Sequence, residues 1–313
     1  MNKDAKMYVA GHNGMVGSAI VRALNKQGFM NLLLRTSKEL DLRDPATTHA
    51  FFQDEKPEYV FMAAAKVGGI LVNSQKKGEF FYDNMMIELN TIEGARLSGV
   101  KKFCFLGSSC IYPKLAPQPI KEEYLMTGHL EASNFGYAAA KIAGVEMCEA
   151  YYEQYGFSYV ALMPCNLYGP GDNFNQNDSH VLGALLRKTV ETKERGASEV
   201  MMWGTGTPRR EFLFVDDVAE ACLFLMKHET SHGLYNVGMG TDVTINELLQ
   251  KIFDVVGFKG TVNHDLSKPD GTPRKVLDVT KLQALGWKPT ISLEEGIKIL
   301  HAWFLEHRHE WEA

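Results

Sequence analysis

A glycine-rich turn near the N-terminus constrains the fold of this chain more than any other feature of its sequence. In "YVAGHNGMVGSAIVRAL", Gly11, Gly14 and Gly17 lie between an apolar run and a helical pattern, with the spacing GxxGxxG. Glycines in such a turn let backbone N–H groups approach a pyrophosphate at the helix N-terminus, where the helix dipole favours anions. An ordinary tight turn with a glycine at a helix contact gives the same spacing, so the turn alone leaves both interpretations open.

Apolar runs at residues 7–10, 31–34, 59–63 and 102–106 alternate with helical patterns, of which one covers 48–55 and another lies near 84–99. A further helical pattern covers 181–196 in the second half. This alternation predicts an α/β fold, a Rossmann doubly wound parallel sheet covered by helices. Beyond residue 171 the pattern becomes irregular, although 211–226 and 233–238 supply one more helix and strand for the same sheet. We therefore expect two discontinuous domains. Residues 1–170 plus 209–240 are expected to form a dinucleotide-binding Rossmann domain, and residues 171–208 plus 241–313 a second, smaller α/β substrate-binding domain.

Composition excludes several classes of partner. The 313 residues carry a formal net charge of -5 without a basic run, so we expect no nucleic acid partner. Five scattered cysteines without a CxxC pair argue against a disulfide framework and a zinc site, so we expect reduced thiols and no metal. No apolar segment approaches the ~18 residues needed to span a bilayer. The N-terminus also lacks an apolar signal region, so we expect a cytoplasmic protein with no membrane partner.

A polar cluster, "LRTSKELDL", follows the second apolar run, at the position that normally meets an adenosine ribose. Arg35, Ser37 and Lys38 could hold a 2′-phosphate, and Asp41 could bind the adenine amino group. A solvated loop would have a similar composition. The cluster favours a nicotinamide dinucleotide, with NADP(H) ahead of NAD(H).

Tyr137 and Lys141 lie four residues apart in "NFGYAAAKIAG", so both side chains project from one face of a helix. A tyrosine titrates near ~10 and needs an adjacent ammonium to transfer its proton at neutral pH. The hydroxyl of Ser108 or Ser109, at the end of an apolar run, can bind the same substrate oxygen. A lone YxxxK is common on amphipathic helices. Its combination with the glycine turn and the serines resembles the extended short-chain dehydrogenase/reductase family of nucleotide-sugar enzymes.

Cys110 is surplus to simple reduction and suggests a second proton chemistry. In a 4-keto nucleotide sugar, carbons 3 and 5 are both α to the carbonyl, and donors that polarise this carbonyl also stabilise the enolate. Inversion needs a base on one ring face and an acid on the other, and Cys110 and His180 are the candidates. The alternatives are a small buried apolar residue for Cys110 and a polar residue at a helix start for His180.

Seven stretches, in order along the chain, are similar to the GDP-L-fucose synthases of that family. They read "AGHNGMVGSAI", "AAAKVGGI", "GSSCIYPKLAPQPI", "YAAAKIAG", "NLYGPGDNFNQNDSHV", "WGTGTPRREFLFVDD" and "SKPDGTPRKVLDVTKLQALGW". The resemblance implies an oxidoreductase and isomerase that epimerises GDP-4-keto-6-deoxy-D-mannose at C3 and C5. NADPH-dependent reduction at C4 then gives GDP-L-fucose. Family members are usually homodimers, so a homodimer is expected.

The resemblance also implies individual roles. Its catalytic positions are Ser108, Cys110, Tyr137, Lys141 and His180, with Cys110 as base, His180 as acid and Tyr137 protonating O4. Its cofactor positions are Gly11, Asn13, Gly14, Met15, Val16, Gly17, Arg35, Ser37, Asp41, Leu42, Leu106, Gly107, Ser108, Tyr137, Lys141, Pro164, Asn166, Leu167 and His180. Its substrate positions are Ser108, Ser109, Cys110, Tyr137, Asn166, His180, Lys188, Trp203, Arg210, Asp270 and Lys275.

Three positions depart from the family pattern. Asn13 stands where the turn often reads GHRG, and Ser37 stands where some members carry an arginine, which weakens the case for NADP(H). Lys188 replaces a common arginine, so a point charge replaces a bidentate fork.

Three other functions stay open. A GDP-L-colitose synthase would act on GDP-4-keto-3,6-dideoxy-D-mannose. A redox-neutral nucleotide-sugar 4-epimerase would need neither Cys110 nor His180. A non-catalytic dinucleotide-sensing protein would have no use for Tyr137 and Lys141.

Overall fold

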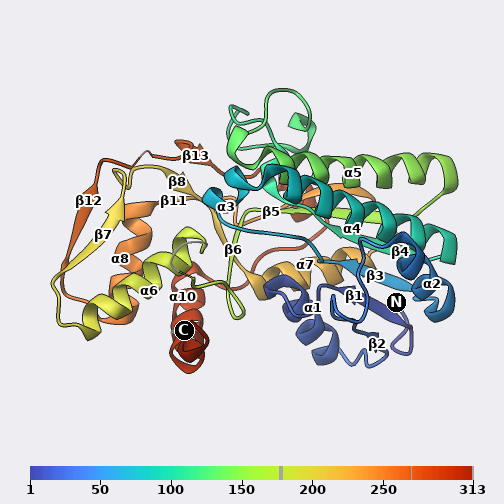
Figure 1. Ribbon diagram of the computed structural model, residues 1–313, viewed down its shortest axis with the longest axis horizontal. Coiled ribbons are helices and arrows are strands. Elements are labelled where there is room, and N and C mark those ends of the chain that lie inside the picture. The colour runs from blue at the N-terminus through green and yellow to red at the C-terminus, as the bar shows by residue number, and fades with distance from the viewer. Residues whose placement is uncertain (176–178, 269, 312–313) are drawn as a thin grey trace.

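The computed structural model describes residues 1–175, 179–268 and 270–311. A larger lobe surrounds a central sheet, and a smaller lobe projects from one side of it (Figure 1). No helix among the described residues is long and apolar enough to cross a membrane.

The larger lobe contains a six-stranded sheet with the order β10-β5-β4-β3-β1-β2. Its strands are β1 (Met7–Ala10), β2 (Leu32–Leu33), β3 (Tyr59–Met62), β4 (Lys102–Leu106), β5 (Tyr159–Pro164) and β10 (Gly233–Val237). Every pair of neighbours in the sheet is parallel. β1, β4 and β5 are buried along their whole length, as expected for strands covered on both faces. The predicted doubly wound parallel sheet is confirmed.

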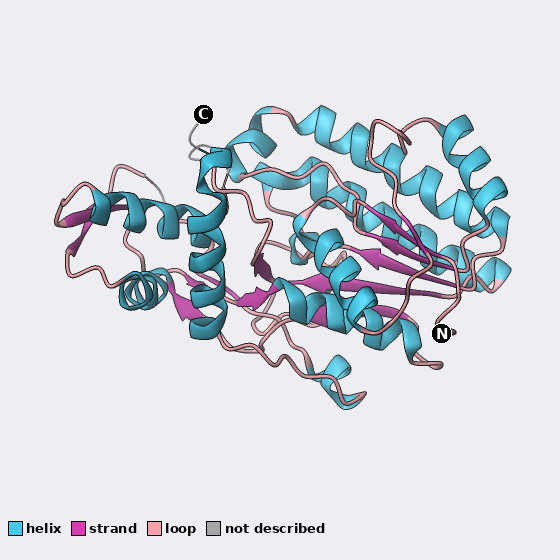
Figure 2. Cartoon of the chain, turned by 90° about the horizontal axis from the view of Figure 1, so that it is seen from below, coloured by secondary structure: helices cyan, strands magenta, loops and turns pink. Residues whose placement is uncertain are grey.

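Helices cover both faces of this sheet (Figure 2). They are α1 (Met15–Lys26), α2 (Pro45–Glu55), α3 (Ile70–Gln75), α4 (Lys77–Ser98), α5 (Phe135–Tyr155) and α7 (Val215–Lys227). α1 packs beside α7, whereas α4 packs between α2 and α5. α2 begins three residues before the predicted pattern, since Asp44 caps it and Pro45 suits a first helical position. α4 begins at Lys77, well before the helix predicted near residue 84.

The smaller lobe combines short strands with three helices. β7 (Glu199–Trp203) pairs in parallel with β12 (Thr261–Asp265), and β8 (Arg209–Arg210) lies between β11 (Val243–Thr244) and β13 (Arg274–Lys275). The helices are α6 (Val181–Glu194), α8 (Ile245–Val256) and α10 (Leu293–His307). A third strand pair joins β6 (Asn166–Tyr168) to β9 (Phe212–Phe214) in parallel. β6 lies where the two lobes meet (Figure 1). α9 (Thr280–Ala284) and the 3₁₀ turns η1 (Ser109–Ile111), η2 (Glu122–Tyr124), η3 (Ala132–Asn134) and η4 (Arg308–Trp311) complete the assignment.

Two separate apolar clusters form the cores of the two lobes. Leu277, Val279, Leu282 and Trp287 pack with the large cluster, so the chain after β13 returns to the larger lobe. Conversely, Tyr168, Phe212 and Phe214 pack with the small cluster. The residue boundaries predicted for the two domains stay a prediction.

Candidate active site

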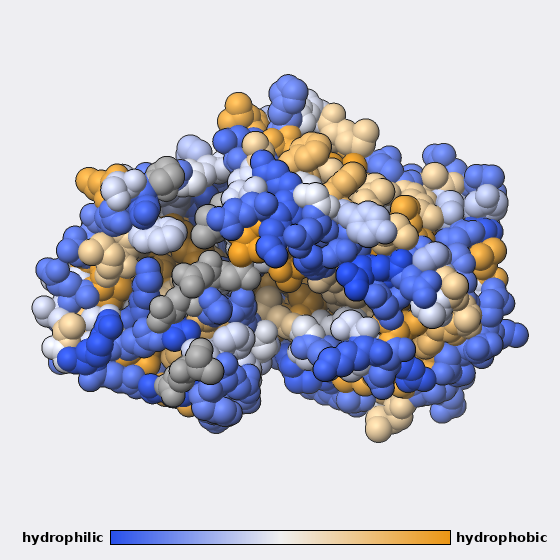
Figure 3. Space-filling view, viewed as in Figure 1, coloured by the Kyte–Doolittle hydropathy of each residue, from blue (hydrophilic) through white to orange (hydrophobic). Residues whose placement is uncertain are grey.

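The carboxyl ends of β1, β3 and β4 gather the candidate residues at one edge of the sheet. The strand order reverses direction between β1 and β3, and open α/β sheets bind ligands outside the strand ends at such a switch point. Gly11 follows β1, Ala63 follows β3 and Ser108 follows β4 within two residues. The space-filling view is hollowed between the two lobes (Figure 3).

The glycine turn has the shape that a dinucleotide requires. A Cβ on Gly17 would lie 2.1 Å from the Gly11 carbonyl oxygen, and Gly11 itself has φ 79° with Ala64 2.7 Å from its Cβ position. Gly14 is the N-cap of α1 and no side chain caps that helix end. The N–H groups of the first turn, which includes Met15 and Val16, are therefore available to an anion. These residues fit a pyrophosphate.

Two charged residues of the segment predicted to meet the ribose, Arg35 and Asp41, form ion pairs within the protein. The Arg35 guanidinium lies 2.9 Å from the Glu55 carboxylate, and it also donates to the Leu34 carbonyl. The Asp41 carboxylate lies 2.8 Å from Arg43, whose hydrogen bonds lower the pKa of Asp41. Asn13, Ser37 and Lys38 are exposed. A 2′-phosphate would have to draw Arg35 from Glu55, and a half-exposed pair of this kind costs little to break.

Lys141 is buried, with only 2% of its side chain exposed. Its Nζ lies 3.0 Å from the Glu88 carboxylate and donates to the Leu106 carbonyl at 2.8 Å. Burial raises the pKa of Glu88, and the Lys141 ammonium opposes this rise. The sequence analysis missed Glu88, because a glutamate in the predicted helix 84–99 reads as a solvated residue.

Tyr137 lies beside this ammonium and beside Ser108. The Lys141 Nζ is 5.9 Å from the centre of the Tyr137 ring, and the nearby Ser108 side chain lowers the pKa of Tyr137. Burial raises the pKa of Tyr137 well above its usual value, and the charges of Cys110 and Glu88 raise it further. Burial therefore keeps Tyr137 as a neutral phenol, and Ser108 lies beside it. Ser109 is only 6% exposed, so the structure favours Ser108 over Ser109 as its hydroxyl partner.

Cys110 is the least buried of the five cysteines, which are all free thiols. Its backbone N–H donates to the Ser108 hydroxyl oxygen at 3.2 Å, so η1 holds the two residues together. The Lys275 ammonium lies 3.9 Å from the Cys110 sulfur. The sequence predicted Lys275 as a substrate residue but gave no sign of this contact.

His180 is exposed and is the N-cap of α6, without a side-chain capping bond. It therefore lies at the start of a helix, and its role as the acid stays a prediction. Among the other predicted cofactor residues, Leu106 and Pro164 end β4 and β5, Leu167 lies on β6, and Leu42 and Gly107 are buried. The Asn166 amide donates to the Glu211 carbonyl at 2.8 Å.

The small-lobe candidates surround an exposed tryptophan. Trp203 is 64% exposed, and the Nζ atoms of Lys188 and Lys268 each lie 5.5 Å from its ring centre. Burial lowers the pKa of Lys188. The sequence did not point to Lys268. This lysine comes near Trp203 only because β12 pairs with β7, and that pairing could not be predicted from the sequence.

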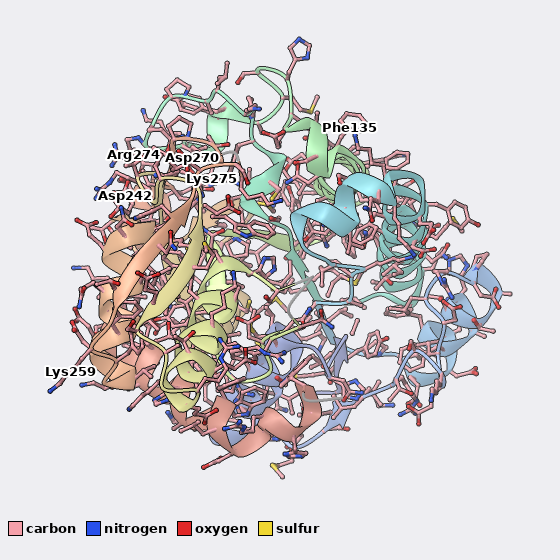
Figure 4. The ribbon with its side chains drawn as sticks, turned by 60° about the vertical axis from the view of Figure 1, so that its left-hand side comes forward. Phe135, Asp242, Lys259, Asp270, Arg274 and Lys275 are labelled. Atoms are coloured by element: carbon pink, nitrogen blue, oxygen red, sulfur yellow. The ribbon has the colours of Figure 1, made fainter. Side chains whose placement is uncertain are left out.

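Arg210 and Asp270 have structural partners. The Arg210 guanidinium donates to the carbonyls of Arg209 and Thr272, and burial lowers its pKa. The Asp270 carboxylate accepts from the backbone and hydroxyl of Thr205 at 2.9 and 2.7 Å. Figure 4 shows Asp270 gathered with Arg274 and Lys275 at one end of the small lobe. No group of three or more His, Cys, Asp or Glu side chains within the described residues is placed to hold a metal ion.

Comparison with known proteins places this geometry in a family. The NAD dependent epimerase/dehydratase family matches residues 7–238. The chain belongs to this family. It is 52% identical over 314 residues to the GDP-L-fucose synthase of Escherichia coli (strain K12), covering 97% of this chain and 97% of that protein. The epimerase/dehydratase frame agrees with the extended short-chain reductase predicted from the sequence.

Two further relatives bear on the substrate and the cofactor. Identity to the GDP-L-colitose synthase of Yersinia pseudotuberculosis is 38% over 306 residues, covering 97% of this chain and 99% of that protein. A crystal structure of a GDP-L-fucose synthetase from Naegleria fowleri bound to NADP has a TM-score of 0.91 and 29% identity. It covers 100% of this chain and 98% of that chain. This member of the epimerase/dehydratase family thus resembles enzymes of GDP-sugars along its whole length.

Proposed function

We propose that this protein is a GDP-L-fucose synthase that uses NADP(H). It would epimerise GDP-4-keto-6-deoxy-D-mannose at C3 and C5 and reduce it at C4. The observation that carries the proposal is the grouping of Ser108, Cys110 and Tyr137 above the buried Lys141. A thiol beside a phenol, a hydroxyl and an ammonium provides both a base for carbon and an acid for oxygen.

The reduction uses the phenol as its acid. Ser108 and Tyr137 bind the 4-keto oxygen and polarise the carbonyl, and Tyr137 gives its proton to O4 as the alcohol forms. The Lys141 ammonium stabilises the phenolate that remains. Bound NADPH supplies the hydride for C4. Gly11, Gly14 and Gly17 would hold its pyrophosphate.

The epimerisations use the thiol and the imidazole. The Cys110 thiolate takes the proton from C3, and the electron pair of the C–H bond moves into an enolate at O4. The His180 imidazolium then gives a proton to the same carbon from the opposite face. The thiol and the imidazole exchange protons with solvent, and the same steps invert C5. Ser108 and Tyr137 stabilise both enolates.

The small lobe would hold the nucleotide. Trp203 offers an exposed aromatic face to guanine, and Lys188 and Lys268 bring two positive charges beside it. Arg210 adds a guanidinium for the diphosphate. These roles rest on the positions of the side chains around Trp203.

The decisive experiment mixes the purified protein with GDP-4-keto-6-deoxy-D-mannose and either NADPH or NADH. Absorbance of the reduced nicotinamide is followed, and the product is identified by NMR. We expect oxidation of NADPH and formation of GDP-L-fucose. No oxidation with this substrate, but oxidation with GDP-4-keto-3,6-dideoxy-D-mannose, would make the protein a GDP-L-colitose synthase, which its 38% identical relative keeps as the second candidate. Failure with both substrates would favour the dinucleotide-sensing protein.

Two variants separate the two chemistries. Cys110→Ser is expected to abolish inversion and to leave some reduction of the unepimerised sugar. Tyr137→Phe is expected to slow reduction by about 10²-fold or more, the usual contribution of a positioned general acid. A fully active Cys110→Ser variant would refute the assignment of the base.

We also propose a homodimer. α4 and α5 pack side by side, and their surfaces carry the aromatic side chains Tyr82 and Tyr155, which are 63% and 51% exposed. Exposed aromatic side chains along both helices favour a protein partner, and the proposed partner is a second copy of the chain. Light scattering should give twice the monomer mass for the wild type. The double variant Tyr82→Glu and Tyr155→Glu should give the monomer mass.

A cytoplasmic location and the two predicted domains complete the proposal. Five free cysteines suit a reducing compartment, and the two apolar clusters suit two folding units. Cell fractionation tests the location. Limited proteolysis tests the boundaries near residues 171, 209 and 241.

A further inference from the structure

The short strand β13 extends from the small lobe to the thiol of the larger lobe. Lys275 pairs with Arg210 of β8. The next residues are held by the larger lobe: the Val276 N–H donates to the Gln118 side chain at 2.9 Å, and the Val276 carbonyl accepts from Ile120 at 2.8 Å. Val276 is 1% exposed. Backbone bonds on both sides therefore fix the position of Lys275.

The two side chains of β13 have different partners. Successive side chains of a strand point to opposite faces. Arg274 forms an ion pair with Asp242, whereas the Lys275 ammonium donates to the Cys110 sulfur at 3.9 Å. Figure 4 shows Arg274 beside Asp242, with Lys275 next along the strand. Among the described residues no ion pair joins Lys275 to a carboxylate, so its ammonium is available to the sulfur.

The Lys275 ammonium also affects a second thiol, that of Cys165. Cys165 is 9% exposed, and burial raises the pKa of this thiol. The Lys275 ammonium is among the groups that oppose this rise. The Lys275 ammonium therefore lies near both thiols, since Cys165 is the residue between β5 and β6.

We propose that Lys275 is the positioning residue of the catalytic base, holding Cys110 as a thiolate directed at the sugar. This inference rests on the proposed function, because the base acts only in the epimerisations. An adjacent ammonium favours a thiolate over a thiol, and the thiolate is the basic form. Lys275 thus belongs to the thiol and not to the nucleotide diphosphate, although the family resemblance placed it among the substrate positions.

The proton balance of the step does not change the charge of Lys275. The thiolate takes the proton from C3 or C5 and becomes a neutral thiol, while the ammonium keeps its three protons. The thiol then loses its proton to solvent, and the ammonium favours that loss. Lys275 therefore resets the base between the two inversions without giving up a proton.

Alkylation of the ligand-free protein tests the contact directly. The other four cysteines are buried, so iodoacetamide should label Cys110 selectively, and mass spectrometry of the peptide follows the rate at pH 7. Lys275→Met should slow the labelling by about tenfold, because only the thiolate reacts. Lys275→Arg, which keeps the charge, should restore most of the rate. Lys259→Met is the matched control: it removes an exposed lysine at the other end of the lobe (Figure 4) and should leave the labelling rate unchanged.

Deuterium exchange separates this proposal from a diphosphate contact. With the GDP-keto sugar in D₂O and no NADPH, Lys275→Met should slow exchange at C3 and C5 by about tenfold at saturating substrate. The substrate concentration at half-saturation should stay close to the wild-type value. An unchanged labelling rate together with weaker substrate binding would make Lys275 a diphosphate ligand and would overturn the proposal.

The two proposals fail in distinguishable ways. If the wild type exchanges no carbon-bound hydrogen of either GDP-keto sugar, the proposed function fails. Alkylation still measures the effect of Lys275 on the Cys110 sulfur in that case. A normal labelling rate in folded Lys275→Met, with circular dichroism matching that of the wild type, would overturn the further inference alone.

Discussion

Asp172 is a buried carboxyl group that the proposed chemistry does not use. It is 3% exposed and lies in the loop between β6 and α6. One oxygen accepts from the Asn173 N–H at 2.8 Å, and the other has no hydrogen-bond partner in the described structure. Burial raises the pKa of Asp172 to about 7, which leaves this carboxyl largely protonated in slightly acidic solution.

Asp172→Asn should therefore stabilise the protein at high pH but not at low pH. The unfolded carboxyl loses its proton near pH ~4, and the folded carboxyl keeps its proton until about pH 7, so wild-type stability falls between these values. The amide has no charge to bury. Urea unfolding should find the variant similar to the wild type at pH 4.5 and more stable at pH 8, by on the order of 3 kcal/mol. An equal difference at both pH values would contradict the buried, raised carboxyl.

The stability losses from substituting Lys141 and Glu88 should not add, whereas reduction should be impaired whenever Lys141 is replaced. Lys141→Met leaves the Glu88 carboxylate buried without its cation, which should cost about 3 kcal/mol. The double variant Lys141→Met and Glu88→Leu removes both charges and should regain most of that loss. Reduction should stay impaired in both proteins, because each lacks the ammonium beside Tyr137. Urea unfolding and NADPH oxidation measure the two quantities, and additive losses in the double variant would contradict the coupling.

For single residues, the sequence predicted the spacing of Tyr137 and Lys141 but not the side chains that contact them. Four residues on a helix bring Tyr137 and Lys141 to one face, and the 5.9 Å contact agrees with this. Glu88 could not be predicted as the partner of Lys141, because the contact joins two helices that are far apart in the sequence. The charge state of a buried group depends on such contacts.

Among the elements, the turn from β1 into α1 is the one whose shape matters most for the cofactor. Gly17→Ala would place a methyl group 2.1 Å from the Gly11 carbonyl oxygen, so α1 must shift away from the strand. We expect NADPH binding to weaken by about tenfold or more, because the helix N-terminus moves from the pyrophosphate. Fluorescence titration of NADPH measures the change.

Gly78→Ala is the matched control for this prediction. Gly78 lies in the first turn of α4, and a Cβ there meets nothing within 4 Å. This variant should bind NADPH as the wild type does and gain up to about 1 kcal/mol of stability from helix propensity. If Gly17→Ala bound NADPH equally well, the turn would not be the phosphate site.

The elements with strong periodicity were predicted, and the short ones were not. β1, β4 and α6 begin at the predicted residues, since apolar runs and helical spacing mark them. β13 has two residues and β8 has two, too few for a pattern. Such strands form because distant segments supply their hydrogen bonds, and tertiary contacts of this kind leave no local signal.

Over the whole molecule, the active site depends on the chain passing repeatedly between the lobes. The doubly wound sheet and the irregular second half were predicted from alternation alone. The contact of Lys275 with Cys110 was not, because it depends on the return of residues 276–278 to the larger lobe. No spacing in the sequence encodes that return.

Glu211 joins the segments that carry this return, and it leads to a prediction for the whole molecule. It is fully buried between β8 and β9, and burial raises its pKa to about 7. Its carboxylate accepts from the Gly240 N–H at 2.6 Å and from the Leu277 N–H at 2.9 Å. One side chain thus ties the residue after Arg210 to the loop after β10 and to the segment after Lys275.

Glu211→Gln should weaken substrate binding without affecting the cofactor. An amide turns one N–H₂ group toward backbone donors, so at least one N–H loses its acceptor at a cost of about 1–3 kcal/mol. The segment of Arg210 then shifts away from the diphosphate, and KM for the GDP-sugar should rise by about tenfold, while the Kd of NADPH stays unchanged because the glycine turn is untouched. Glu220→Gln is the control, because Glu220 lies on α7 and binds Gln27 of the larger lobe at 2.9 Å. A rise in KM alone would show that this buried carboxylate aligns the two lobes for the sugar. A rise in the NADPH Kd equal to the rise in KM would instead mean that Glu211 supports the fold in general.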